Sequence, residues 1–282
     1  MSLINNLRIV GHVCHDRTTD GYILGGTASY AALLGAQLSD KIILTTSYGQ
    51  DFGFAEIFDK ANLSVELKES DKTTEFENIY TEHSRKQYLH GRADNLYFSD
   101  LGDVLDTQAI LLGPIADEVD LSSFDALDDH ILIGAAIQGW LRQFRPDGLV
   151  YQKPPDLSSF KCIDIAFMSD DDILGMPLLL EQLKDSIEYV VVTHGINGVS
   201  IHHNNLIEHY PSYQTHPVDP TGAGDIFSVA FLCALYKTGN LTYAASFGHS
   251  AASLSIEGLG ISTIPSLNQI QERQEEYSKR YL

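Results

Sequence analysis

The sequence predicts an α/β protein: a three-layer, doubly wound, mostly parallel sheet with a small β appendage. Short apolar runs alternate with helical segments through the second half of the chain, which is typical of parallel strands covered on both faces. Residues 73–98 instead alternate polar with aromatic or aliphatic side chains, which predicts antiparallel strands with one wet face. We therefore expect one domain over 1–282, with an appendage built from about 16–24 and 73–98.

The first part of the chain predicts the start of the sheet. Residues 7–10 form an apolar run that is typical of a buried strand. Residues 27–38 are rich in Ala and Leu and predict a helix that begins after a Gly-Gly turn. Residues 41–47 predict a further strand, and apolar residues at helical spacing over 53–61 predict a further helix.

The rest of the chain predicts the remaining sheet and a helical end. We expect core strands at 109–112, 131–133, 163–168 and 189–193, and helices at about 223–237, 241–256 and 267–280. Doubly wound sheets bind ligands beyond the carboxyl ends of their strands. The functional site is therefore expected at that edge of the sheet.

Composition and charge disfavour several classes of function. The formal net charge of −20 repels phosphate backbones and disfavours nucleic-acid binding, although backbone amides and a Mg²⁺ ion could still hold a nucleotide. The three cysteines, Cys14, Cys162 and Cys233, are far apart, which predicts a reduced, cytoplasmic setting. No apolar run approaches the ~20 residues of a membrane span, and no charged leader precedes an apolar stretch. We therefore expect neither membrane insertion nor secretion.

The segment 219–227 carries the strongest chemical signal, and it reads DPTGAGDIF. Small residues at the start of an apolar helix expose backbone N–H groups, and the helix dipole favours an anion there. A carboxylate in such a turn suits proton acceptance, with Asp225 as the base and the amides of Gly222, Ala223 and Gly224 stabilising the developing negative charge. From its residues alone, this segment could also be an ordinary glycine-rich turn capped by an aspartate.

The same segment resembles the signature of the ribokinase-like, or PfkB-type, carbohydrate kinases. The resemblance implies a ribokinase-like fold and transfer of a phosphoryl group from ATP to a hydroxyl of a sugar or polyol. It also implies that Asp225 is the catalytic base, that Gly222, Ala223 and Gly224 form an anion hole, and that Thr221 lies beside the nucleotide. ATP and Mg²⁺ are the cofactors that this family implies.

A second group of residues near the N-terminus resembles the side of that family's site that binds the substrate. Asp16 follows the first predicted strand, and Gly25-Gly26 precedes the first helix. A carboxylate can accept hydrogen bonds from two hydroxyls of a polyol. Tyr30 stands where the family commonly has asparagine. A zinc site made of the neighbouring His12–Asp16 segment is disfavoured, because successive residues on an extended chain point to opposite faces.

Weaker matches to the family's motifs indicate which residues would lie beside the nucleotide and which would bind the metal. Thr193, Gly195 and Gly198 belong to a T-x-G-x-x-G stretch that resembles the one beside the nucleotide, and His249 lies in a stretch that resembles the helix covering adenine. Asp172 stands where the family's N-x-x-E motif organises Mg²⁺, so it is the candidate metal ligand. The alternative interpretation of this acidic segment is a helix N-terminus capped by serine, and both interpretations could hold together.

The acceptor is less sharply indicated. The segment 137–142, which reads IQGWLR, resembles part of plant-type myo-inositol kinases and implies substrate contacts for Gln138 and Arg142. The resemblance implies that the appendage acts as a lid, which would exclude water from the site. Its exposed strands could pair across a homodimer or close over a monomer's site. Two alternatives stay open: a kinase for a nucleoside or another small alcohol, and a non-catalytic, ligand-binding regulatory member. Tyr30, Ala136 and Ser169, which depart from the family pattern, motivate the second alternative.

Overall fold

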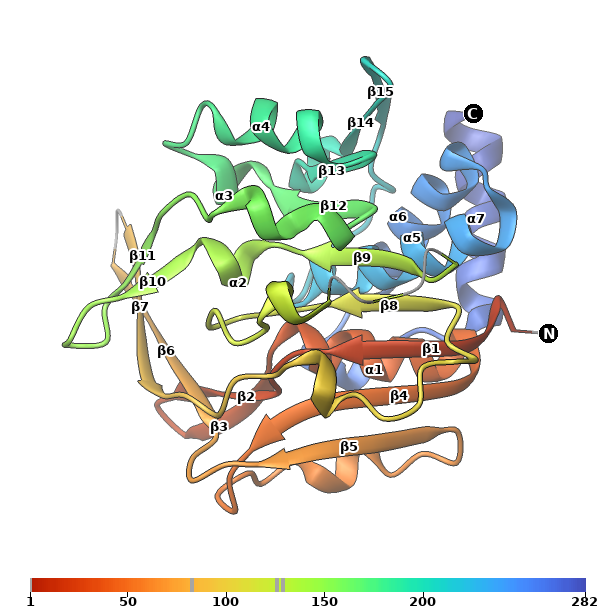
Figure 1. Ribbon diagram of the computed structural model, residues 1–282. Helices are drawn as coiled ribbons and strands as arrows, with labels where there is room; N and C mark the ends of the chain where they lie inside the picture. The colour runs from red at the N-terminus through yellow and green to blue at the C-terminus, as the bar shows by residue number, and fades with distance from the viewer. Residues whose placement is uncertain (1, 82–83, 125–126, 128–129) are drawn as a thin grey trace.

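The computed structural model describes residues 2–81, 84–124, 127 and 130–282, and its centre is a nine-stranded sheet (Figure 1). The strand order is β15-β14-β13-β12-β9-β8-β1-β4-β5. Seven of these strands, from β13 to β5 in that order, run parallel, and β14 and β15 add antiparallel pairs at one edge. The strands are β1 Ile4–Val10, β4 Ser39–Tyr48, β5 Leu63–Glu69, β8 Ala109–Leu112, β9 Leu132–Ala136, β12 Ile165–Ser169, β13 Tyr189–Thr193, β14 Val199–His203 and β15 Leu206–Tyr210.

Successive side chains of the central strands enter two separate apolar cores, which makes the fold three-layered. Ile9 of β1 and Leu111 of β8 pack in one core, whereas Val10 and Leu112 pack in the other. The first core contains the helices α1 Thr27–Leu38, α5 Ala223–Thr238, α6 Leu241–Ser255 and part of α7 Leu267–Tyr281. The second contains α4 Leu179–Ser186 and several 3₁₀ turns; α2 Gln138–Leu141 and α3 Asp170–Ile173 are single-turn helices nearby.

A second sheet, called the small sheet below, stands at the carboxyl ends of the parallel strands (Figure 1). Its strands are β2 Cys14–Thr18, β3 Gly21–Gly25, β6 Thr74–Thr81 and β7 Ser84–Gly91, in the order β3-β2-β6-β7. The β2 and β6 strands pair in parallel, contrary to the antiparallel expectation. They do so because each follows a parallel strand of the main sheet and leaves it at the same edge. Residues 82–83 of the predicted appendage lie outside the described residues.

Two local expectations differ from the structure. The predicted helix over 53–61 is only a 3₁₀ turn at Ala55–Phe58, since Phe58 alone in that turn is buried and little holds a longer helix in place. A short antiparallel pair, β10 Arg142–Phe144 with β11 Val150–Gln152, was not expected and continues from α2. The helices expected near 27–38, 223–237, 241–256 and 267–280 are confirmed. In the described part of the chain, no helix has both the length and the apolar character needed to span a bilayer.

Candidate active site

The turn before α5 has the backbone geometry that its glycines predict. Gly222 is the N-cap of α5 with φ 77°, a left-handed conformation that glycine adopts without strain. Asp219 holds the turn because its carboxylate accepts hydrogen bonds from Thr221 N at 3.0 Å and Gly260 N at 2.9 Å. Burial alone would raise the pKa of Asp219, but these hydrogen bonds lower it below its ordinary value. The first turn of α5 is therefore fixed with its N-terminus toward the site.

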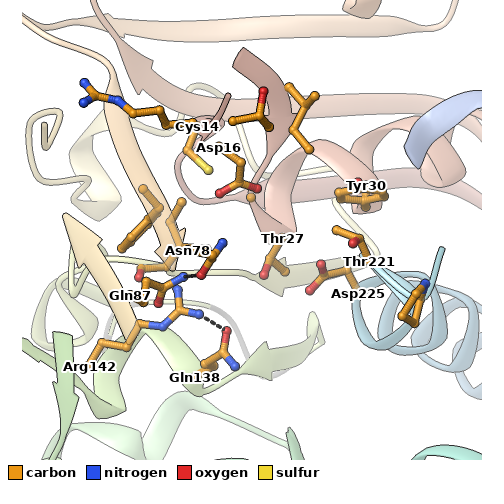
Figure 2. A pocket seen from close by; sticks show the side chains of 18 of the residues that line it. Cys14, Asp16, Thr27, Tyr30, Asn78, Gln87, Gln138, Arg142, Thr221 and Asp225 are labelled. Carbon is orange, nitrogen blue, oxygen red and sulfur yellow. Dashed lines mark hydrogen bonds between the residues drawn. The ribbon is translucent and has the colours of Figure 1, made fainter. Parts of the chain in front are cut away.

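Asp225 projects from this first turn toward the N-terminus of α1 (Figure 2). Desolvation by the surrounding side chains raises the pKa of Asp225 to about 6. A hydrogen bond from the Thr27 side chain and the positive charge of Arg142 act in the opposite direction, whereas Asp172 and Asp16 raise the pKa further. The carboxyl is therefore a base whose pKa lies close to neutral pH.

Two cavities meet at Asp225. One, of about 750 Å³, is called the Asp16 cavity, and the small sheet forms one of its walls. The other, of about 350 Å³, is called the Asp170 cavity, and it follows the carboxyl ends of β12 and β13. Six residues line both cavities: Thr27, Gln138, Asp171, Pro220, Gly222 and Asp225. A ligand in each cavity would thus bring its end to the same carboxylate.

The Asp16 cavity is rich in hydrogen-bonding side chains (Figure 2). Asp16 comes from β2, and Asn78 and Gln87 face each other across β6 and β7, where Gln87 Nε2 donates to Asn78 Oδ1 at 3.0 Å. Arg142 enters from β10 and lies over the Phe76 ring, 5.2 Å from its centroid. A compact molecule with several hydroxyls would find both donors and acceptors on these walls.

Arg142 is anchored to a backbone carbonyl of a loop that a buried acidic side chain holds in place. The guanidinium donates to Ile115 O at 2.9 Å. Glu118 is fully buried and holds that loop, because its carboxylate accepts from the backbone N–H of Ile115, Ala116 and His12. Glu118 therefore provides acceptors for the buried N–H groups of this turn, and it fixes the position of the carbonyl to which Arg142 donates.

The Asp170 cavity differs in its charge. Four aspartates line it, Asp170, Asp171, Asp172 and Asp225, and no lysine or arginine is among its described lining residues. The amide hydrogen of Ala223 already turns back to Pro220 O at 3.2 Å, so in this conformation it is engaged within the turn. A polyphosphate bound here would need a cation in addition to backbone N–H groups.

Asp172, the candidate metal ligand, is held by hydrogen bonds on both carboxylate oxygens. Oδ2 accepts from Ser169 N at 2.9 Å and Ser169 Oγ at 2.8 Å, and Oδ1 accepts from Gln138 Nε2 at 2.8 Å. Ser169 caps α3, as the alternative interpretation of this segment expected. The described residues contain no group of three or more His, Cys, Asp or Glu side chains arranged to hold a metal. Metal binding at Asp172 stays a prediction.

Most of the predicted site residues come together, but a few are placed elsewhere. Gly26 and Tyr30 line the Asp16 cavity, and Thr193, Gly195 and Gly224 line the Asp170 cavity. Gly25 lies behind Asp16: a Cβ atom on it would meet Asp16 Oδ2 at 2.2 Å. Thr221, expected beside the nucleotide, lines the Asp16 cavity instead.

Gly198 and His249, which were predicted to lie beside the nucleotide, line neither the Asp16 cavity nor the Asp170 cavity. A Cβ atom on Gly198 would lie 2.0 Å from Tyr210 O, so this glycine, with φ 99°, is required by the turn between β13 and β14. His249 is buried in α6, with its ring 5.1 Å from that of Phe227 and 6.0 Å from that of Tyr277. Burial lowers the pKa of His249 to about 4, so the imidazole is neutral at pH 7.

Sequence reasoning missed several residues of the site, among them Thr27, Asn78, Gln87 and Asp171. Asn78 could have been found from strand periodicity, because it lies two residues after Phe76 and therefore on the same face of β6. Thr27 directly follows the Gly-Gly turn that was recognised. Asp171 belongs to the acidic segment in which Asp172 alone was expected to act, and nothing in the local sequence distinguishes Gln87 from an ordinary surface residue.

Comparisons with known proteins agree with this fold. The model of the pfkB family carbohydrate kinases matches residues 138–267. Inositol 3-kinase of Arabidopsis thaliana is 28% identical over 270 residues, which cover 89% of this chain and 74% of that protein. Nucleoside kinase of Methanothermobacter thermautotrophicus is 25% identical, with coverage of 88% and 84%.

A solved structure shares the whole fold. It is a pyrophosphate-dependent kinase of the ribokinase family in complex with a pyrophosphate analogue and myo-inositol. Its TM-score is 0.77 at 19% identity, over 95% of this chain and 99% of that one. The fold, the paired cavities and these relatives together define a kinase for a sugar, a polyol or a nucleoside. The resemblance is to the pfkB family of carbohydrate kinases, whose model matches somewhat less than half of the chain.

Proposed function

We propose that this kinase transfers the γ-phosphoryl group of ATP to a hydroxyl of a cyclic polyol of the myo-inositol type, with Asp225 as the catalytic base. The observation that carries the proposal is that Asp225 lies at the junction of two cavities, one rich in hydrogen-bonding groups and one at the N-terminus of α5. This arrangement suits an in-line transfer, because the acceptor hydroxyl must attack the γ-phosphorus from the side opposite the leaving oxygen, with the base beside that hydroxyl.

The Asp16 cavity is proposed as the acceptor site. Asp16, Asn78, Gln87 and Arg142 offer hydrogen bonds to several hydroxyls at once, which suits a polyol better than the flat aromatic face of a nucleobase. Two relatives point the same way, since one is named inositol 3-kinase and one was solved with myo-inositol. A nucleoside is the second candidate, because Phe76, Ile23 and Ile115 also line the cavity and one relative is a nucleoside kinase.

The Asp170 cavity is proposed as the donor site, with Gly222 and Gly224 offering backbone N–H groups to the transferred phosphoryl group. The helix dipole of α5 adds a favourable field there. Mg²⁺, entering with the donor, would offset phosphate charge beside Asp170, Asp171 and Asp172. Carboxylates are the oxygen ligands that this ion prefers, although these three are not arranged as a preformed metal site. Asp225 accepts the hydroxyl proton as the acceptor oxygen bonds to the γ-phosphorus and the bond from that phosphorus to the leaving oxygen of ADP breaks. A base with a pKa of about 6 is ionised at pH 7.

The function is tested with a matrix of acceptors and donors. The purified chain is supplied with ATP or pyrophosphate, each with Mg²⁺, and with myo-inositol, ribose, fructose or adenosine. Phosphorylated products are identified by ³¹P NMR. We expect the highest kcat/KM for myo-inositol with ATP. A preference for adenosine would overturn the proposed acceptor, and a preference for pyrophosphate would overturn the proposed donor. Ligand binding without any phosphoryl transfer would favour the non-catalytic, regulatory alternative.

A further inference from the structure

Gln138 occupies a special position between the two cavities. It is the first residue of α2, directly after β9, and it lines both the Asp16 cavity and the Asp170 cavity. Its amide group makes a hydrogen bond at each end. Oε1 accepts from Arg142 Nη2 at 2.5 Å (Figure 2), and Nε2 donates to Asp172 Oδ1 at 2.8 Å. One side chain thus joins a cation of the first cavity to a carboxylate of the second.

The orientation of this amide is determined by charge. A flipped amide would place its NH₂ group against the guanidinium and its oxygen against the carboxylate, and both contacts would be repulsive. Only glutamine combines an acceptor and a donor at this length, since glutamate would place a second negative charge beside Asp172. The bridge therefore requires the amide itself and not merely a side chain of similar volume.

The bridge extends at both ends into parts of the site that a ligand would contact. Arg142 lies over the Phe76 ring of the small sheet and is anchored at Ile115 O. On the other side, Asp172 holds Ser169, the cap of α3, through its backbone N–H and hydroxyl. A continuous series of hydrogen bonds therefore runs from the wall of the Asp16 cavity to the wall of the Asp170 cavity.

We propose that Gln138 is a positioning residue that couples the two cavities, so that acceptor and donor bind cooperatively. Acceptor hydroxyls that bind Arg142 fix its guanidinium and, through the amide, fix Asp172 at the donor side. Whichever ligand binds first orders the three side chains, and the second ligand then binds more tightly because that ordering cost is already met. This inference rests on the proposed function, which places the acceptor in the Asp16 cavity and the donor in the Asp170 cavity.

The test measures binding and not turnover. The full chain is titrated calorimetrically with the non-hydrolysable ATP analogue AMP-PNP and Mg²⁺, without and with saturating myo-inositol, and then in the reverse order. We expect each ligand to raise the affinity of the other by the same factor, about tenfold, since coupling between binding sites is reciprocal. In Gln138→Met, which keeps the side-chain length and removes both hydrogen bonds, the factor is expected to fall to about one.

Gln143→Met is the matched control. Gln143 is the same residue type, five positions further along the chain, but it lines a separate cavity of about 410 Å³ and neither of the two cavities at Asp225. This variant is expected to keep the tenfold factor, and thermal unfolding of each variant checks that the fold is intact. If wild type binds both ligands independently, or if Gln138→Met keeps its coupling, the inference is overturned while the proposed function stands. If the wild type binds neither ligand and phosphorylates no acceptor, the proposed function fails first.

Discussion

The ring of Tyr30 packs directly against Gly222: a Cβ atom on this glycine would lie 2.5 Å from Tyr30 Cδ1. Gly222 also has φ 77°, so the position excludes other residues by conformation as well as by space. We expect Gly222→Ala to lower the free energy of unfolding by about 1–3 kcal/mol and to reduce kcat at least tenfold, because the first turn of α5 is displaced.

Gly224→Ala is the stability control for this prediction. Gly224 lies in the same helical turn, but a Cβ atom there would meet nothing within 4 Å. Alanine favours helix over glycine, so the unfolding temperature should stay equal or rise. Equal destabilisation of the two variants, measured by thermal unfolding, would contradict the role assigned to the Tyr30 contact.

Two variants of Tyr30 distinguish the packing of its ring from hydrogen bonding by its hydroxyl. Its side chain is only 3% exposed, so Tyr30→Ala should cost about 3–5 kcal/mol of stability through the cavity it leaves. Tyr30→Phe keeps the ring and should cost less than about 1 kcal/mol. If the hydroxyl binds the acceptor, Tyr30→Phe raises KM for the polyol without changing KM for ATP. Steady-state kinetics with each substrate varied in turn decides this.

Asp225 gives a prediction on activity and its pH dependence. Asp225→Asn should reduce kcat by about 10²–10⁴, the range that a positioned general base contributes. In the wild type, the base works only when ionised, so kcat/KM should rise with pH and level off above about 6. A profile that stays flat down to pH 5 would contradict the assignment, as would a variant that keeps activity within tenfold.

The same residue predicts a gain in stability for the inactive variant. The pKa of Asp225 is raised from 3.8 to about 6 on folding, so the ionised carboxylate destabilises the fold, and stability is lost as pH rises from about 4 to about 6. Asp225→Asn should therefore be more stable than wild type at pH 7, by at most about 3 kcal/mol. The difference should vanish near pH 4. Urea unfolding at both pH values measures it.

Thr27 should set the acid limb of the profile. Its side chain hydrogen bonds to Asp225 and lowers the pKa of that carboxyl, which burial raises. Thr27→Val removes the hydroxyl and keeps the methyl group that packs near Gly113. The acid limb of kcat/KM should then move to higher pH, and Thr27→Ser should move it back. A purely structural role would lower activity at all pH values equally.

Much of this molecule could be predicted from local sequence. The four long helices were expected within one or two residues of their ends. Three of them, α1, α5 and α6, are long runs of apolar and small residues, and α7 repeats apolar residues at helical spacing. The edge strands β5 and β15 were not expected, since they mix exposed and buried residues. The strand β14 beside β15 was not expected either, because its five residues include a serine and two histidines. A helix was expected over 53–61, where the structure has only a 3₁₀ turn at Ala55–Phe58, because so short an apolar pattern does not distinguish a helix from a single turn.

What the sequence determined by itself is the turn DPTGAGD: glycines where the backbone turns, an aspartate in the first helical turn, and hence the class of reaction. Only the tertiary structure decided which side chains share that site with Asp225. Gln138 bridges two cavities and His249 is buried against Tyr277, although both stood in equally suggestive motifs. The physical reason is that backbone conformation is set by neighbours in the chain, whereas the direction of a side chain is set by packing between distant segments.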